Sequence, residues 1–179
     1  PVAHPIGATG AGSASRAALP AFQDGRWLHL DARGNRAAIA APVDLGGIGK
    51  GLVLRWTMRR LAGLVTLERD DRGALLEAGG DLVARGPAPG GGPWLVGIED
   101  PAGGGERAVV TLAHGAVATS STRIHAWRTA DGRAVHDLLD PRTGEPGGDG
   151  LASVTVAGPD PAWAEVWSKA LFLEGGRGI

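Results

Sequence analysis

The stretch DLGGIGKG, residues 44–51, combines four glycines with one lysine directly before a segment that has helical spacing. A Walker A nucleotide-binding loop requires glycine where this chain has Asp44, and Ser or Thr where it has Gly51. The dinucleotide-binding pattern also fails, because Gly47 and Gly49 are followed by a glycine one residue too early. Backbone N–H groups exposed by glycines before a helix can still bind an anion. Two interpretations stay open, an anion-binding loop and a simple turn into a helix.

Three further polar clusters are expected at strand ends or glycine-rich turns, where binding residues often lie. They are EAGGD at residues 77–81, TSSTR at 119–123 and HDLLDPRTGEP at 136–146. Ser120 lies in no nucleophile elbow, which favours hydrogen bonding to phosphate over nucleophilic attack. His136 is a candidate general base, because histidine changes charge near neutral pH, although a lone histidine is more often a packing or surface residue. The segment from Asp140 to Gly144 has the composition of a turn.

Near the C-terminal end of the sequence, Glu165, Ser168 and Lys169 have a spacing that places them on one face of a helix. One interpretation is an exposed Glu–Lys pair, which would contribute about 0.3–0.5 kcal/mol. The other is a carboxylate and a cation that face a phosphate or a metal ion.

The composition narrows the class of protein. The chain has 179 residues, including 31 glycines and no cysteine, and a formal net charge of −1. Its length suffices for one domain with a core, and the lack of cysteine excludes disulfides and Cys-ligated metals. The sequence shows no basic patch with interleaved aromatic residues, so it does not indicate nucleic-acid binding. It also contains no apolar run long enough to be a transmembrane segment. The sequence begins at Pro1 without a visible signal sequence, which leaves the compartment open.

The residue patterns predict an α+β fold with mixed or antiparallel sheets and flanking helices. Residues 1–20 are expected to be a loose lead-in, and residues 21–179 a single domain. A hairpin is expected over 26–41 and a strand broken at Gly79-Gly80 over 73–86. Further strands are expected over 93–101 and 153–158, with two short strands within 107–120. Helices are expected over 52–68 and 161–176. In the second helix, the apolar spacing predicts an inner face of Trp163, Val166, Ala170 and Leu173.

The order of these clusters, more than any one of them, carries a family resemblance. From about Trp27 to its C-terminus, this chain resembles the ApbE-type FAD:protein FMN transferases. The motifs that carry the resemblance follow one another in the same order, namely DLGGIGKG, AGGDL, PWLVGIEDP, AVATSS, HDLLDPRTGEP, SVTVAG and AEVWSKALFLEGG. By this resemblance, the N-terminal third of a typical member, which supplies part of the flavin pocket, is missing here. The resemblance implies an α+β protein that binds FAD and a divalent metal, usually magnesium. It also implies transfer of FMN to a Thr or Ser hydroxyl of a target flavoprotein, with release of AMP.

The resemblance also implies roles for individual residues. Gly47 matches a backbone metal ligand, and Lys50 matches a flavin contact. The other implied site residues are Asp44, Ala78, Gly79, Gly80 and Asp81 in the glycine-rich motifs, Leu138 or Leu139 as an aliphatic flavin contact, His136 and Asp140 as catalytic candidates, and Arg142 in the family turn. Glu165, Ser168 and Lys169 match the helix that supplies further metal ligands.

Two departures from the family pattern leave the chemistry open. Asp137 stands where many members have a second histidine, and Glu165 and Lys169 stand where they have Asp and Thr ligands. A charged lysine does not ligate magnesium, which leaves three alternatives. The Lys169 ammonium replaces part of the metal's charge, the chain binds the metal more weakly than its relatives do, or the chain belongs to a subfamily with altered chemistry. The alternatives to a transferase are an FAD-binding module that has lost transfer and an FAD pyrophosphatase that releases FMN and AMP. The compartment stays open: family analogy alone offers an extracytoplasmic, membrane-associated location, and the cytoplasm is the alternative.

Overall fold

The computed structural model describes residues 28–40, 43–64 and 72–177. The chain divides into two compact units, residues 1–44 and residues 45–179. The lead-in expected over residues 1–20 lies outside the described residues. The expectation of a single domain over 21–179 stays a prediction.

The first unit contains a β-hairpin. Strands β1 (Leu28–Asp31) and β2 (Arg36–Ile39) pair in antiparallel fashion. The Asp31 carboxylate accepts hydrogen bonds from the backbone N–H groups of Arg33 and Gly34, at 3.1 and 2.9 Å, as Asp commonly does in turns. The hairpin predicted over this segment is confirmed.

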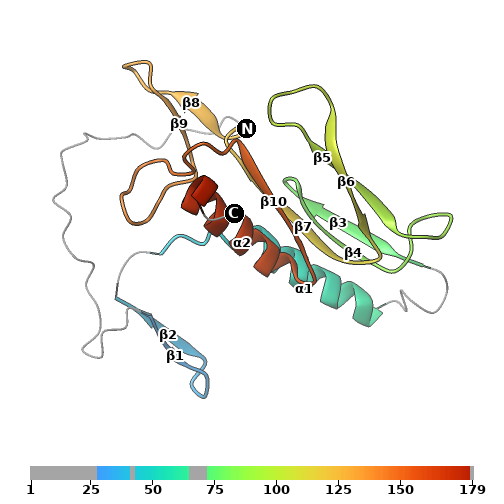
Figure 1. Cartoon of the computed structure of the whole chain (residues 1–179). Coiled ribbons are helices and arrows are strands. Elements are labelled where there is room, and N and C mark those ends of the chain that lie inside the picture. The colour runs from blue at the N-terminus through green and yellow to red at the C-terminus, as the bar shows by residue number, and fades with distance from the viewer. Residues whose placement is uncertain (1–27, 41–42, 65–71, 178–179) are drawn as a thin grey trace, which may run out of the picture. The chain divides into compact units, whose positions relative to one another are not determined.

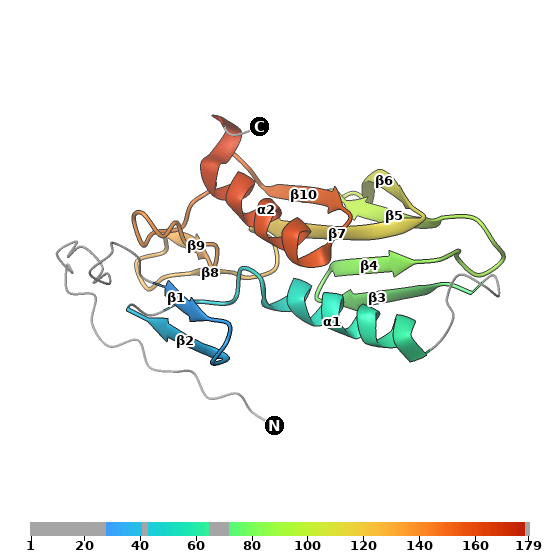
Figure 2. The ribbon, with the colours of Figure 1, turned by 90° about the horizontal axis from the view of Figure 1, so that it is seen from below.

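The second unit is built on a four-stranded antiparallel sheet with the strand order β10-β7-β4-β3. Its strands are β3 (Ala74–Ala78), β4 (Asp81–Arg85), β7 (His114–Ser121) and β10 (Ser153–Gly158). Helices α1 (Gly49–Leu64) and α2 (Pro161–Glu174) lie side by side on one face of this sheet (Figure 1, Figure 2). A hairpin of β5 (Trp94–Glu99) and β6 (Glu106–Leu112) covers the other face. A smaller ribbon of β8 (Ala126–Arg128) and β9 (Ala134–His136) precedes the loop to β10, and a short 3-10 turn, Gly175–Arg177, follows α2.

The alternation of side chains along the strands gives the sheet two apolar faces. On the helix side, Val83 and Ala116 pack against Leu54 and Met58 of α1. On the hairpin side, the intervening residues belong to a second cluster with members in β5 and β6, namely Ala84, Val96, Leu112 and Val117. This two-residue period is why SVTVAG and its partner strands were predictable as half-buried strands.

One strand prediction was wrong in its topology. Residues 73–86 form two antiparallel strands, not one broken strand, because the chain reverses at the glycine pair. Gly79 has φ +58° and Gly80 has φ +87°, the left-handed conformations that a two-residue hairpin turn requires and that glycine adopts without strain.

The inner face predicted for the last helix was also wrong. Trp163 is 60% exposed, whereas the fully buried residues of α2 include Ala164, Glu165, Ser168 and Phe172. The small residues face inward because the two helices cross at very short range. A Cβ atom added to Gly51 of α1 would lie 2.5 Å from both the Ala162 Cα and the Pro161 carbonyl oxygen. Large side chains are excluded from such a backbone contact.

Helix α1 confirms the prediction over its described part, since Leu54 and Met58 are buried and Leu61 packs against them. It begins at Gly49, three residues before the expected start, and the residues expected after Leu64 lie outside the described part. Neither α1 nor α2, over the described residues, has the length and apolar character needed to cross a bilayer.

Asp160 caps α2 and ties it to α1. Its carboxylate accepts from the N–H groups of Ala162 and Trp163, at 3.0 and 3.1 Å, and pairs with Arg55. Burial raises the pKa of this carboxyl, but the hydrogen bond from Arg55, those from the two N–H groups and the positive charge of Arg55 outweigh it, so the pKa lies below its ordinary value of 3.8.

Replacing Asp160 with Asn is therefore expected to lower the free energy of unfolding by about 1 kcal/mol at neutral pH, because the cap survives but the ion pair does not. A lowered folded-state pKa contributes stability above the unfolded-state pKa and loses it as the pH falls through the folded value. The difference between variant and wild type should thus be present at neutral pH and disappear at an acidic pH below the lowered folded-state pKa of Asp160. Urea unfolding at the two pH values measures this, with Asp149→Asn as an exposed control. An equal difference at both pH values would contradict the assignment.

Candidate functional site

The N-terminal end of α1 brings together several of the residues predicted to form a site. Lys50, in the first turn of α1, lies with its Nζ 2.9 Å from Asp81 Oδ2, at the start of β4, and 3.5 Å from the Gly79 carbonyl oxygen. Asp81 is only 2% exposed, and its Oδ1 accepts from the Thr119 N–H at 3.1 Å. The Asp81 carboxylate, at the end of the β3–β4 turn, thus pairs with Lys50 and is fixed by its hydrogen bond from Thr119 of β7.

A second carboxylate–lysine pair lies at the same helix end. Glu165 is 1% exposed, and its Oε2 accepts from the Gly51 N–H at 2.7 Å. Its Oε1 lies 3.3 Å from Lys169 Nζ, one turn further along α2. The exposed Glu–Lys pair considered from the sequence is therefore excluded, because the carboxylate is buried and joins α2 to the first turn of α1.

Ser120 and Ser168 connect the sheet to α2 beside this pair. Their hydroxyl oxygens are 2.9 Å apart, and Ser168 also donates to the Glu165 carbonyl oxygen at 2.9 Å. Since a hydroxyl has one proton, Ser120 donates to Ser168. Both side chains are buried, so their hydroxyls hold the strand and the helix together.

The glycines of the two loops lie against the lysine stems. A Cβ atom on Gly47 would be 3.5 Å from Lys169 Cδ, and one on Gly79 would be 3.6 Å from Lys50 Cδ. Ala78 ends β3 and pairs with Asp81 across the turn, and Gly80 donates its N–H to the Glu77 carboxylate at 2.6 Å. The loops predicted to line a site therefore do converge, except that Asp44 ends the first unit and its place beside Gly47 stays a prediction.

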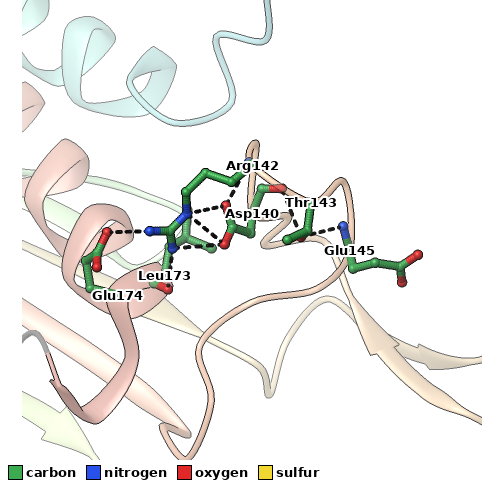
Figure 3. A network of polar contacts seen from close by, with 6 residues as sticks. All are labelled: Asp140, Arg142, Thr143, Glu145, Leu173 and Glu174. Atoms are coloured by element: carbon green, nitrogen blue, oxygen red, sulfur yellow. Dashed lines mark hydrogen bonds and ion pairs between the residues drawn. The ribbon is translucent and has the colours of Figure 1, made fainter. Parts of the chain in front are cut away.

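Asp140 and Arg142 lie in a separate polar network at the C-terminal end of α2 (Figure 3). Arg142 donates from Nε and Nη2 to the Asp140 carboxylate at 2.9–3.0 Å. It also donates to the Glu174 carboxylate at 3.0 Å and to the Leu173 carbonyl oxygen at 3.4 Å. These bonds, together with the charges of Asp140 and Glu174, keep the pKa of Arg142 above its ordinary value. The geometry is that of a clamp between a turn and a helix end, and the ligand-related roles of both residues stay predictions.

His136 packs on the same part of α2. Its ring meets Phe172 edge-on, with the centroids 5.8 Å apart, and its Nδ1 accepts from the Leu138 N–H at 3.3 Å. Leu138 is a core residue at 8% exposure, whereas Leu139 is 52% exposed and accessible to a ligand. In the described part of the chain, no recorded hydrogen bond or ion pair joins His136 to either lysine pair, so its role as a base stays a prediction.

The residues predicted to bind magnesium do not fit that ion. Magnesium takes oxygen ligands in nearly octahedral geometry, but both carboxylate oxygens of Glu165 are engaged, one by the Gly51 N–H and one by the Lys169 ammonium. The Ser168 hydroxyl is engaged by Ser120 and by a backbone carbonyl, which leaves only the Gly47 carbonyl of the predicted set. Among the described residues, no three His, Asp or Glu side chains gather into a group that could hold a metal.

The sequence did not reveal the bonds that anchor the two carboxylates, from Thr119 to Asp81 and from Gly51 to Glu165. The available signal was local. Glu165 lies among Ala162, Ala164 and Ser168, and such small neighbours indicate a tight helix crossing in which a carboxylate would be buried.

A cavity of about 420 Å³ opens on the opposite face of the sheet, between it and the β5–β6 hairpin. Its lining is mostly apolar and includes Leu82, Val96, Ile98, Val117 and Ile124, with Gly80 and Thr119 at the side of the Asp81 anchor. Ligand pockets for small molecules are commonly of this size and character.

The family model, the related sequences and the solved structures described below all point to the same protein family. A family model described as the ApbE family matches residues 11–178. FAD:protein FMN transferases of Klebsiella pneumoniae (strain 342) and Escherichia coli (strain K12) are each 33% identical over 135 residues, which cover 74% of this chain but 37% of theirs. The crystal structure of the ApbE protein from Thermotoga maritima matches with a TM-score of 0.74 and 33% identity, covering 84% of this chain and 48% of that one. The apo flavinyl transferase ApbE of Pseudomonas stutzeri matches with a TM-score of 0.67 and 31% identity, covering 85% and 45%.

This chain thus spans less than half the length of these relatives. Its antiparallel sheets with two flanking helices are the α+β fold that was predicted, and the solved structures share that fold. With a family model that covers almost the whole sequence, the chain belongs to the ApbE family.

Proposed function

We propose that this chain carries out FAD:protein FMN transfer, from FAD to a Thr or Ser hydroxyl of a target flavoprotein. The observation that supports it most directly is the pair of lysines on buried carboxylates at the first turn of α1, within a chain of the ApbE family. Relatives that this chain matches are named for this reaction.

The proposed reaction is a phosphoryl transfer. The acceptor hydroxyl oxygen forms a bond to the phosphorus of the FMN half, the bond from that phosphorus to the bridging oxygen breaks, and AMP leaves with the bridging oxygen. The hydroxyl proton passes to a base, for which His136 is the candidate. In such transfers the protein mainly positions the groups and neutralises negative charge. The Lys50 and Lys169 ammonium groups supply that charge at the diphosphate.

The apolar cavity beside Gly80 is proposed to hold one of the ring systems of FAD, because its apolar walls suit a flat aromatic group. By family analogy, the target is a membrane electron-transfer protein that acts outside the cytoplasm.

The test is to incubate the purified chain with FAD and a flavoprotein domain that carries an unmodified Thr acceptor. The expected products are a fluorescent covalent FMN adduct on the target and an equal amount of AMP. A target in which the acceptor Thr is replaced by Val is the matched control and should stay unlabelled. AMP with free FMN instead of adduct would indicate a pyrophosphatase, and bound but intact FAD would indicate a binding module. Either result would overturn the transferase.

A further inference from the structure

We propose that this chain binds the diphosphate of its ligand with two lysine ammonium groups and no divalent cation. The identity of the ligand as FAD rests on the proposed function, whereas recognition of a diphosphate anion rests on the geometry of the two lysine pairs.

The choice of cations in the sequence is the first argument. Lys50 and Lys169 are the only two lysines among the 18 basic Lys and Arg residues of the chain. Lys50 is in the first turn of α1, and Lys169 of α2 pairs with the carboxylate that binds the Gly51 N–H of that turn, whereas the other 16 of these 18 residues are arginines. An ammonium is a compact charge with three donors that can turn toward a ligand, whereas a guanidinium is a rigid planar fork.

The two pairs are built in the same way. In each, a carboxylate that is almost completely buried accepts from a backbone N–H and carries a lysine that reaches the surface. The Lys50 and Lys169 side chains are 40% and 23% exposed. Their carboxylates come from different elements, Asp81 from β4 and Glu165 from α2. The same arrangement of buried carboxylate, backbone N–H and lysine therefore occurs twice in this chain.

Each ammonium keeps donors for a ligand. In the described part of the chain, Lys169 donates to Glu165, and Lys50 donates to the Gly79 carbonyl oxygen and forms an ion pair with Asp81. With three N–H bonds on each ammonium, unused donors remain on both. The stems run beside Gly47 and Gly79, where the lack of a side chain leaves the loop backbone open to an anion.

The same pairs disfavour a divalent ion. Each carboxylate is already neutralised by its own lysine, so the site offers no net negative charge to a cation. A metal at Glu165 would have to displace the Lys169 ammonium or the Gly51 N–H. Because like charges repel strongly at the protein surface, the ammonium and the metal exclude one another. The lysine therefore takes the metal's place as the counter-charge.

The test uses the whole chain with [ζ-15N]lysine, titrated with inorganic pyrophosphate in EDTA. Two ammonium signals are expected, one for each lysine, and both should shift with a single dissociation constant. Calorimetry with pyrophosphate and with FAD should show that binding persists in EDTA. Binding that requires magnesium, or a shift of only one lysine signal, would overturn the proposal.

Variants sharpen the outcome. Lys169→Thr should weaken pyrophosphate binding in EDTA about tenfold, the loss expected for one charge-assisted contact. Magnesium should then strengthen its binding, since Glu165 becomes available as an oxygen ligand. Lys169→Arg, which restores the charge but not the compact ammonium, should recover only part of the affinity without magnesium. Arg107→Thr, at an exposed position near the start of β6, is the matched control and should bind as wild type. Circular dichroism and thermal unfolding establish that each variant is folded, and a folded Lys169→Thr with wild-type affinity in EDTA would contradict the proposal.

These results are separable from the proposed function. Pyrophosphate binding in EDTA without any FMN adduct would remove the transferase and keep the two-lysine site. FMN transfer that depends on magnesium would keep the transferase and remove the two-lysine site.

Discussion

Replacing Glu165 with alanine is expected to lower the free energy of unfolding by about 3 kcal/mol. The variant loses a buried carboxylate that joins the two helices, and it leaves the Gly51 N–H without its acceptor and Lys169 without its counter-charge. The unsatisfied buried N–H and the unpaired ammonium each lower the stability of the folded variant. The cavity left by the missing side chain lowers it further. Urea unfolding followed by circular dichroism measures the loss.

Two companion variants separate charge from shape. Glu165→Gln keeps an oxygen for the Gly51 N–H but removes the charge, so its loss should be intermediate. Glu174→Ala, which removes an exposed carboxylate from the same helix, should cost less than about 1 kcal/mol. If Glu165→Ala were as mild as Glu174→Ala, the buried anchor described for Glu165 would not exist in solution.

Replacing Phe172 with alanine is expected to cost about 3–5 kcal/mol of stability. Phe172 is fully buried and packs with Leu138 and Val154. A Cβ atom on Gly148 would lie 2.2 Å from its ring, so the loop before β10 is fitted closely to this side chain. The loss of the ring leaves a cavity that the loop cannot fill without moving.

The same variant should change the behaviour of His136, whose ring stands edge-on against Phe172. In the folded fraction, the NMR signals of the His136 ring should shift, because the imidazole loses the aromatic ring that it packs against. Trp167→Ala, at a half-exposed position of the same helix, is the control and should change neither the stability by a comparable amount nor the His136 signals. A Phe172→Ala variant of wild-type stability would show that the packing around Gly148 is not as described.

The sequence was sufficient for the elements that local pattern decides. The hairpin at Asp31, the alternation of residues 153–158 and the apolar spacing of Leu54 and Met58 each depend on near neighbours. The buried face of α2 was not predictable in this way, because the spacing of apolar residues along the helix allows either the tryptophans or the alanines to face the core. The contact of its backbone with Gly51, more than a hundred residues earlier, excludes the tryptophans.

The candidate site shows the same division. Ordered motifs were enough to predict that Lys50, Gly79, Asp81, Glu165 and Lys169 belong to one region. The pair of Glu165 and Lys169 could be read from their spacing of four residues. The ion pair of Asp81 with Lys50 and the backbone N–H bonds to both carboxylates could not, since they join segments distant in sequence. The metal-ligand role expected of Glu165 therefore gave way to an anchoring role.

The hydrogen bond from Gly51 to Glu165 has a consequence for the order of events during synthesis. The two residues are 114 positions apart, so at about 5–20 residues per second the ribosome adds the carboxylate roughly ten seconds after the amide that it holds. Until then the first lysine is present without the second, and the glycine loop has no partner to fix it. The two lysines therefore come together only after α2 has been synthesised and has docked on α1, and a nascent chain cannot engage an anion through both lysines before that point.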